Sequence, residues 1–184
     1  MRFIIVKNGI YNFDTIRDVI QSLVGNSIKA VKDDSNVIVY HNYSNDDEIR
    51  KTLSALETEL LTNMYAYISG EIADDRIEEA LVIAKMLINN IPNGVYNFKE
   101  ALLHSSKIEN KEAVLDYILK YTGISEDFIK DFVNCDLNVS KASKEMFIHR
   151  NTMIYKLDKL SSISGFDLRS FKDAYILYML INNK

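Results

Sequence analysis

Apolar residues follow two alternating patterns along the first two thirds of the chain. Short continuous apolar runs are typical of strands, whereas apolar residues that recur every three or four positions predict helices. The predicted elements are a strand at 3–6, a helix at 14–24, strands at 28–31 and 37–40 joined by a polar turn at 32–36, a helix at 49–61, and a strand at 64–69. Asp14 is the expected N-cap of the first helix, and Asn45 or Asp46 is that of the second.

The order of these elements is β-α-β-β-α-β, the order of the ferredoxin-like arrangement. That arrangement has an antiparallel sheet with two helices on one face. A further helix is expected at 74–90 and ends before Pro92, the only proline of the chain. The front of the chain is therefore predicted to be an α+β sandwich.

The remainder of the chain is predicted to be helical. Apart from a weak strand pattern near Tyr96 no strand is indicated, whereas helical periodicity occurs at 113–121, 126–135, 140–147, 150–163 and 170–182. Gly123 and Gly165 stand where C-terminal helix caps are expected. The polar stretch 104–111 is the natural boundary, so we expect an α+β domain at 1–104 and an all-α domain at 105–184.

Composition limits the classes of protein that fit this chain. It has 184 residues, 47% of them hydrophobic, which suits one domain or two small ones and excludes a disordered or collagen-like chain. The longest unbroken apolar run, 174–181, is far too short to span a membrane, and the N-terminal apolar stretch is too short for a signal sequence. The lone Cys135 excludes an internal disulfide and fits a reducing, cytoplasmic compartment.

The net charge differs between the front and the back of the chain. Taken whole, a formal charge of −4 argues against nucleic-acid binding, because phosphates bind Lys and Arg. Residues 1–123 hold 13 basic and 18 acidic side chains, whereas residues 124–184 hold nine basic and eight acidic ones. The acidity therefore belongs to the front domain. Weak nonspecific DNA affinity and a contribution from dimerisation remain the expectation.

The segment 138–165, NVSKASKEMFIHRNTMIYKLDKLSSISG, carries the strongest functional pattern. It predicts two short helices on either side of a tight turn at 147–149, as in a helix-turn-helix. A helix that enters the major groove needs an apolar stripe that fixes its angle and a first turn that offers polar donors to base edges. The inward-facing positions are expected to be Val139, Ala142, Met146, Met153, Leu157, Leu160 and Ser164.

Polar and basic side chains of this segment are the candidate DNA contacts. Arg150 can form a forked pair of hydrogen bonds with guanine, and Asn151 or His149 can bond bases or cap the helix. Thr152 and the lysines further along the helix suit phosphates. The full candidate set is Lys141, His149, Arg150, Asn151, Thr152, Ile154, Tyr155, Lys156 and Lys159. Five basic residues against two acidic ones at 138–160 support this set, although a solvated basic face on an ordinary helix pair has the same spacing and charge.

The identity of the residues distinguishes between these two interpretations. His149-Arg150-Asn151-Thr152-Met153-x-Tyr155-Lys156-Leu157, followed by Leu160 and Ser164-Gly165-Phe166-Asp167-Leu168, closely resembles the C-terminal helix-turn-helix of PucR/CdaR-type bacterial transcription regulators. The resemblance covers about residues 128–180. It implies sequence-specific binding to double-stranded DNA, with the helix from about Arg150 in the major groove. Ile154, where a basic or polar residue is frequent, and Lys156, in place of the usual Arg, are departures that bear on which operator is read.

The front domain resembles the degenerate GGDEF-like domain that precedes this helix-turn-helix in CdaR-type regulators. Its turn reads Asp33-Asp34-Ser35-Asn36, without the glycines that let phosphates approach the backbone of a nucleotide cyclase. We therefore expect no catalysis, and a role in dimerisation or ligand sensing. His41 and His104 are isolated from other metal-ligating residues, so neither a metal nor another cofactor is expected.

These observations favour a cytoplasmic, DNA-binding transcriptional regulator that is not an enzyme. The expected partners are double-stranded DNA, a second copy of the chain in a homodimer and an unidentified small-molecule effector, with no membrane. Two alternatives stay open: a nucleotide-binding or nucleotide-cyclase-like relic, and a protein-interaction adaptor without DNA binding.

Overall fold

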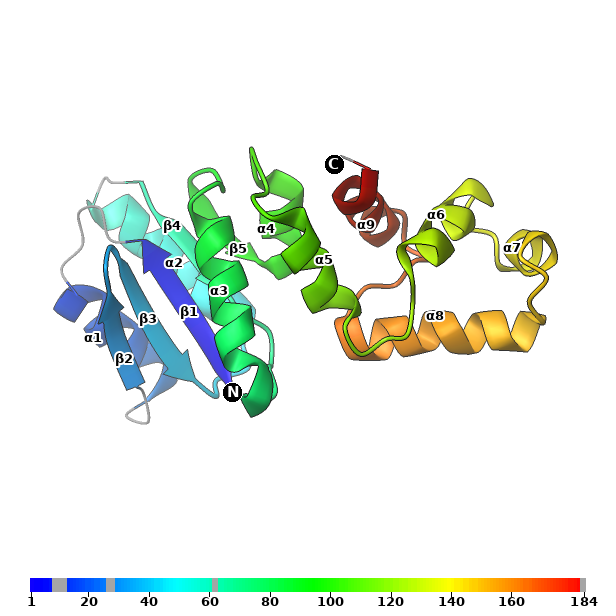
Figure 1. The fold of residues 1–184 in the computed structure, drawn as a ribbon. Coiled ribbons are helices and arrows are strands. Elements are labelled where there is room, and N and C mark those ends of the chain that lie inside the picture. Colours follow the sequence, from blue (N-terminus) through cyan, green and yellow to red (C-terminus); the bar gives the residue numbers. More distant parts are fainter. Residues whose placement is uncertain (8–12, 26–28, 61–62, 183–184) are drawn as a thin grey trace. The chain divides into compact units, whose positions relative to one another are not determined.

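The computed structural model describes residues 1–7, 13–25, 29–60 and 63–182. The chain forms two compact units, Met1–Glu109 and Asn110–Lys184 (Figure 1). The fold is mixed α+β, with one five-stranded sheet in the first unit.

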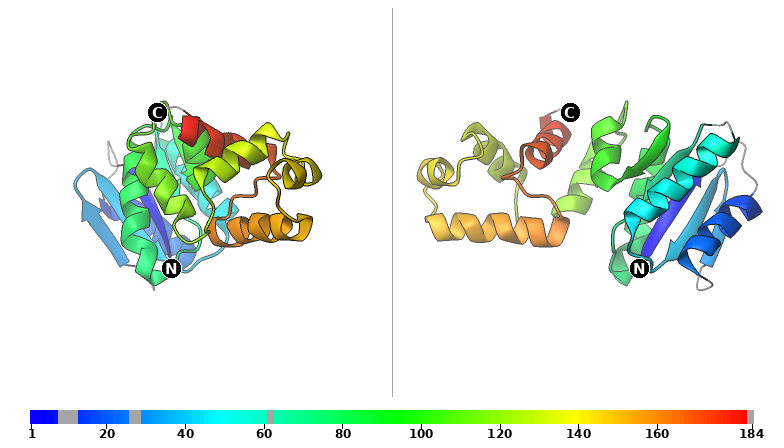
Figure 2. Two further views of the ribbon diagram at one scale, coloured as in Figure 1. Left: turned by 45° about the vertical axis from the view of Figure 1, so that its right-hand side comes forward. Right: turned by 180° about the vertical axis from the view of Figure 1, so that it is seen from behind.

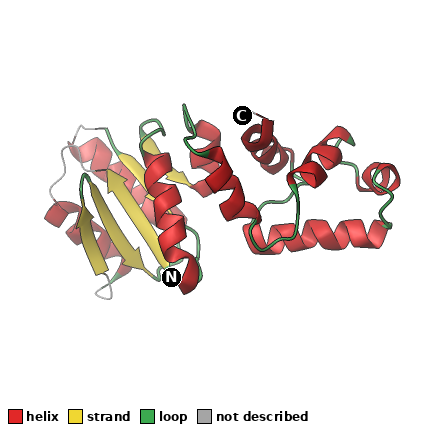
Figure 3. Ribbon diagram, viewed as in Figure 1, coloured by secondary structure: helices red, strands yellow, loops and turns green. Residues whose placement is uncertain are grey.

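Strands and helices alternate in the N-terminal unit (Figure 3). Its elements are β1 (Arg2–Lys7), α1 (Phe13–Val24), β2 (Lys29–Asp33), β3 (Asn36–His41), α2 (Asp46–Leu60), β4 (Tyr65–Ile68), the 3-10 turn η1 (Asp74–Arg76), α3 (Ile77–Ile88), β5 (Gly94–Asn97) and α4 (Phe98–His104). The elements predicted for residues 3–69 are therefore confirmed, except that positions 28 and 61 lie outside the described residues.

The sheet has the strand order β2-β3-β1-β4-β5. All neighbours are antiparallel except β4 and β5, which are parallel. Central strand β1 places Ile4 opposite Val39 of β3 and opposite Ile68 of β4. Because side chains alternate along a strand, Ile4 and Val6 lie on one face and Phe3 and Ile5 on the other, which explains an unbroken apolar run on a strand covered on both sides.

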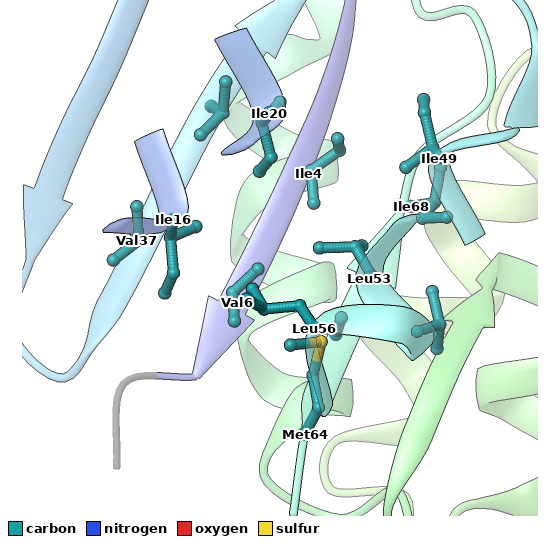
Figure 4. Close-up of a cluster of buried hydrophobic side chains, with 13 residues drawn as sticks. Ile4, Val6, Ile16, Ile20, Val37, Ile49, Leu53, Leu56, Met64 and Ile68 are labelled. Atoms are coloured by element: carbon teal, nitrogen blue, oxygen red, sulfur yellow. The ribbon is translucent and has the colours of Figure 1, made fainter. Parts of the chain in front are cut away.

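One face of the sheet packs against α1 and α2 (Figure 4). Ile16 and Ile20 come from α1, Ile49 and Leu53 from α2, and all four are almost completely buried. Burying each such side chain contributes about 1.5–3 kcal/mol. This cluster confirms that the two predicted helices share one face of the sheet.

The opposite face is covered by α3, which contacts β1 and β4. Figure 1 shows α3 in front of the sheet, and the right-hand view of Figure 2, from behind, shows α1 and α2 in front of it. On this face Phe3 stacks on Tyr67 with ring centroids 5.9 Å apart. The sheet is thus the middle layer of three.

Helix starts account for the differences from the predicted boundaries. Asp14 is the second residue of α1 and not its N-cap, so that expectation was wrong; there its carboxylate complements the helix dipole. Asn45 does cap α2, since its Oδ1 accepts a hydrogen bond from the Glu48 N–H at 3.2 Å. The unpredicted helix α4 begins with a capping box, in which Asn97 and Glu100 each bond the other's backbone N–H. The weak strand pattern near Tyr96 corresponds to β5.

The described residues of the C-terminal unit form helices joined by loops, without strands. It consists of α5 (Lys111–Leu119), α6 (Glu126–Asn134), α7 (Val139–Glu145), α8 (Arg150–Ser164) and α9 (Phe171–Asn182). Figure 2 shows α8 extending from α7 at its start to α5 at its end, and contacts join α8 to both. Its core is formed by completely buried side chains: Ile129, Phe132, Leu157, Leu160, Phe166 and Leu177.

The glycines of this unit differ in role. Gly165 is the C-cap of α8 with φ +76°, as predicted. Gly123 also has a positive φ but lies in the loop after α5, whose C-cap is Lys120, so its predicted capping role was wrong. No helix in the described part of the chain is long and apolar enough to cross a membrane.

Candidate nucleic-acid interface

Helix α7 is short and is held at its start by Asn138. The Asn138 Oδ1 accepts hydrogen bonds from the backbone N–H groups of Ser140 at 2.9 Å and Lys141 at 3.0 Å. Ala142 and Ser143 are buried, and the Ser143 hydroxyl donates to the Val139 carbonyl. Small side chains at these positions let α8 pack closely against α7.

The turn between α7 and α8 has the hydrogen bonds of a Schellman motif. The Phe147 N–H donates to the Lys144 carbonyl at 3.2 Å, and the Ile148 N–H donates to the Ser143 carbonyl at 2.9 Å. Phe147 has φ +52°, in the left-handed region that favours glycine. Its side chain is 96% exposed. The turn therefore holds a large aromatic ring in solvent.

His149 begins α8. Its backbone is extended, and its Nδ1 accepts a hydrogen bond from the Asn151 N–H at 3.3 Å. The imidazole thus takes the place that Ser, Thr or Asp usually occupies at an N-cap. Of the two roles predicted for His149, the structure shows the capping one.

The two sides of α8 differ in burial. Met153, Leu157 and Leu160 are completely buried and fix the helix on the unit. Asn151 and Tyr155 are exposed on the other side, Tyr155 by 65%. The remaining candidates on this helix are placed as follows: Arg150 and Thr152 are exposed, and Ile154, Lys156 and Lys159 are partly exposed.

The candidate cations are in unlike surroundings. Arg150 has no ion pair with any residue that the structure describes. Lys141 lies 2.7 Å from Asp136, and this hydrogen bond raises the pKa of Lys141. The Lys156 Nζ lies 5.5 Å from the centre of the Phe128 ring, a cation–π contact. The Lys159 Nζ lies 3.5 Å from where a Cβ atom at Gly123 would stand.

Two relevant features were not predicted from the sequence. Arg169 bridges Asp158 on α8 and Asp167, each at 2.8 Å, and the hydrogen bond with Asp167 is the largest cause that raises the pKa of Arg169. This arginine offsets the negative charge of Asp158 on the exposed part of α8. The second is the exposed ring of Phe147. No signal in the sequence relates Asp158 to Arg169, because their pairing depends on the path of the loop between α8 and α9.

Helices α7 and α8, joined by a tight turn, form a helix-turn-helix with an exposed first turn on its second helix. Comparison with known proteins agrees with this class. Residues 128–182 match the family described as the PucR C-terminal helix-turn-helix domain. Similar proteins include the carbohydrate diacid regulator of Escherichia coli (strain K12), 46% identical over 39 residues, and the DNA-binding transcriptional activator AdeR of Bacillus subtilis (strain 168), 35% identical over 51 residues. These matches show that residues 128–182 are similar to the PucR C-terminal helix-turn-helix domain, and that part of the chain is similar to segments of two proteins named as a regulator and a transcriptional activator.

The matches are confined to part of each protein. The alignments cover 21% of this chain and 10% of the E. coli regulator, and 28% of this chain and 12% of AdeR. The uncharacterized protein YxkF of Bacillus subtilis (strain 168) is 36% identical over 52 residues, which are 28% of this chain and 18% of that protein. The crystal structure of a regulator of polyketide synthase expression from Bifidobacterium adolescentis aligns with 97% of this chain and 77% of its own, with 15% identity and a TM-score of 0.49.

Proposed function

We propose that this protein is a sequence-specific, DNA-binding transcriptional regulator whose recognition helix is α8. The observation that carries the proposal is Arg150, which is exposed and unpaired among the described residues at the first position of the second helix of a helix-turn-helix. This position allows the guanidinium to reach base edges when the start of α8 enters the major groove. The family match of residues 128–182 supports the same function.

The candidate residues divide into roles by their surroundings. Arg150 recognises guanine, Asn151 contacts an adjoining base, and His149 sets the direction of the first turn as its cap. Thr152 and Lys159 bind phosphates. The outward side chains Ile154 and Tyr155 contact the groove further along α8.

Lys141 and Lys156 contribute less to DNA binding in this proposal. Each already has a partner, Asp136 for Lys141 and the Phe128 ring for Lys156. Moving either ammonium to a phosphate would give up that contact. Both lysines therefore add to the local positive potential more than they fix the position of the DNA.

For the N-terminal unit we propose a ferredoxin-like, degenerate GGDEF-like domain that is not catalytic. The order β2-β3-β1-β4 with antiparallel neighbours supports the ferredoxin-like part. In the turn region, Asp33 forms an ion pair with Lys85 of α3, and Asp34 has φ +48° in place of a glycine. We assign this unit, 1–104 by sequence, to homodimerisation or to sensing a small-molecule effector. Homodimerisation would link two copies of residues 105–184, and two linked copies can bind two half-sites.

Selection of bound sequences from a random DNA pool tests the proposal. The purified protein is expected to enrich one sequence, and binding to it should weaken as salt rises. Arg150→Ala should lower the ratio of specific to random binding, whereas Lys159→Ala should weaken both about equally. Arg17→Ala, which removes the same charge from the N-terminal unit, is the matched control. Folded protein that enriches no sequence would overturn the proposal.

A further inference from the structure

Phe147 is the most exposed of the large hydrophobic side chains in the described part of the chain, at 96%. A ring with so little contact adds nothing to the packing of the unit. The exposed ring does not gain the free energy that burial would supply, and its surface is available to a binding partner.

The backbone conformation of Phe147 is a second observation that bears on why a phenylalanine occupies this position. The residue stands at the left-handed position of the Schellman motif that ends α7, where glycine fits without strain. Neither the turn nor the core requires a phenylalanine there. A strained position that carries a solvent-exposed ring supports a functional explanation.

The neighbourhood of Phe147 indicates what kind of partner it meets. The residue lies two positions before His149, the N-cap of α8, and so beside the first turn of that helix. Lys144 and Arg150, within three positions of it, are exposed, and Glu145 is the one acidic side chain at 138–150. An apolar ring flanked by cations suits a polyanion that also offers an apolar group.

We infer that Phe147 is a specificity-determining residue that contacts the 5-methyl group of a thymine next to the bases read by Arg150. The methyl group of thymine is the apolar feature that base edges present in the major groove. The inference rests on the proposed function, since it places the start of α8 in that groove. It adds a thymine preference that the polar residues of α8 do not supply.

Replacing thymine by deoxyuracil tests the contact directly, because this exchange removes the methyl group and keeps the base pair. Each thymine of the selected sequence is replaced in turn, and wild-type protein, Phe147→Gly and Phe147→Asn are titrated against each duplex. At one position deoxyuracil should weaken wild-type binding about fourfold, which corresponds to about 0.8 kcal/mol for one methyl-sized group. Both variants should bind the thymine duplex at least fourfold more weakly than the wild type and should not respond to deoxyuracil.

The outcomes separate this inference from the proposed function. Circular dichroism and thermal unfolding establish that each variant is folded, and glycine and asparagine both tolerate the left-handed backbone. If the wild type binds specifically and Arg150→Ala impairs it, but no thymine responds to deoxyuracil, the inference is wrong and the proposed function stands. A change of oligomeric state in Phe147→Gly without DNA would also overturn the inference, because the ring would then contact a second copy. If the wild type selects no sequence, the proposed function itself fails.

Discussion

The Nζ of Lys141 lies 2.7 Å from the Oδ2 of Asp136, in the loop that precedes α7. Asp136 is a non-glycine residue with φ +57°, at the Schellman turn that ends α6, and this turn brings its carboxylate to α7. A lysine that the sequence places among the candidate DNA contacts is therefore held by an acid of its own unit.

Asp136→Asn should strengthen binding to specific and random DNA alike. The substitution releases Lys141 for a phosphate and also removes one negative charge. DNA titrations at several salt concentrations should show that the affinity of the variant falls more steeply with salt than that of the wild type, by about one released counterion. Asp131→Asn, at an exposed position of α6, makes the same charge change without releasing a lysine and is the matched control. Equal effects of the two variants, or an effect of Asp136→Asn that persists in the Lys141→Ala background, would show that Lys141 does not move to DNA.

The stability of the N-terminal unit should fall as the pH drops below about 6.5. His41 is 3% exposed, and its pKa is lowered by burial first and by the charge of Arg2 second, while Asp46 acts in the opposite direction. Near pH 7.5 the imidazole is neutral in both the folded and the unfolded chain, so protonation of His41 does not lower the free energy of unfolding there. Below the ordinary pKa the unfolded chain takes up a proton that the folded chain does not, so the free energy of unfolding decreases until the lowered pKa is reached.

Urea unfolding at pH 7.5 and 5.5 measures this effect. The loss attributable to His41 is at most about 1.4 kcal/mol per pH unit. His41→Leu should flatten the dependence, so that its free energy of unfolding changes less between the two pH values than that of the wild type. An unaltered slope in His41→Leu would assign the pH dependence to other groups.

The helix-turn-helix was predictable because its signals are local. The apolar spacing of Met153, Leu157 and Leu160 is read from consecutive turns of one helix, and all three are buried as predicted. Helix α4 also has a local signal, because Asn97 and Glu100 stand at capping-box spacing. Periodicity does not reveal this helix, since seven residues are too few to show a helical repeat.

The surroundings of the charged candidates were not predictable, because they depend on contacts between elements. Lys156 faces Phe128 on α6, and Arg169 reaches Asp158 from the loop before α9. Side-chain type and spacing along α8 do not indicate which cation has a partner. The structure shows that Lys141 and Lys156 have partners, whereas Arg150 has no ion pair among the described residues.

Asn138→Ala should destabilise the helix-turn-helix by about 1 kcal/mol. The substitution removes the oxygen that accepts hydrogen bonds from the N–H groups of Ser140 and Lys141, and a seven-residue helix has few other bonds to hold its start. Chemical unfolding followed by helical circular dichroism measures the change. Asn138→Ser keeps a capping oxygen and should recover most of the stability. If the alanine variant is as stable as the wild type, water replaces the cap without loss.

Arg169→Ala should weaken DNA binding although Arg169 is not among the predicted contacts. The guanidinium lies 2.8 Å from Asp158, so its removal leaves a negative charge uncompensated on the exposed part of α8, the helix that we propose to contact DNA. The expected loss of affinity is larger at low salt than at high salt, because the effect is electrostatic. Titrations at two salt concentrations measure it. Asp158→Asn in the same chain should restore affinity, since it removes the charge that Arg169 offsets. If the double variant binds as weakly as Arg169→Ala alone, Arg169 acts by direct contact with DNA and not through Asp158.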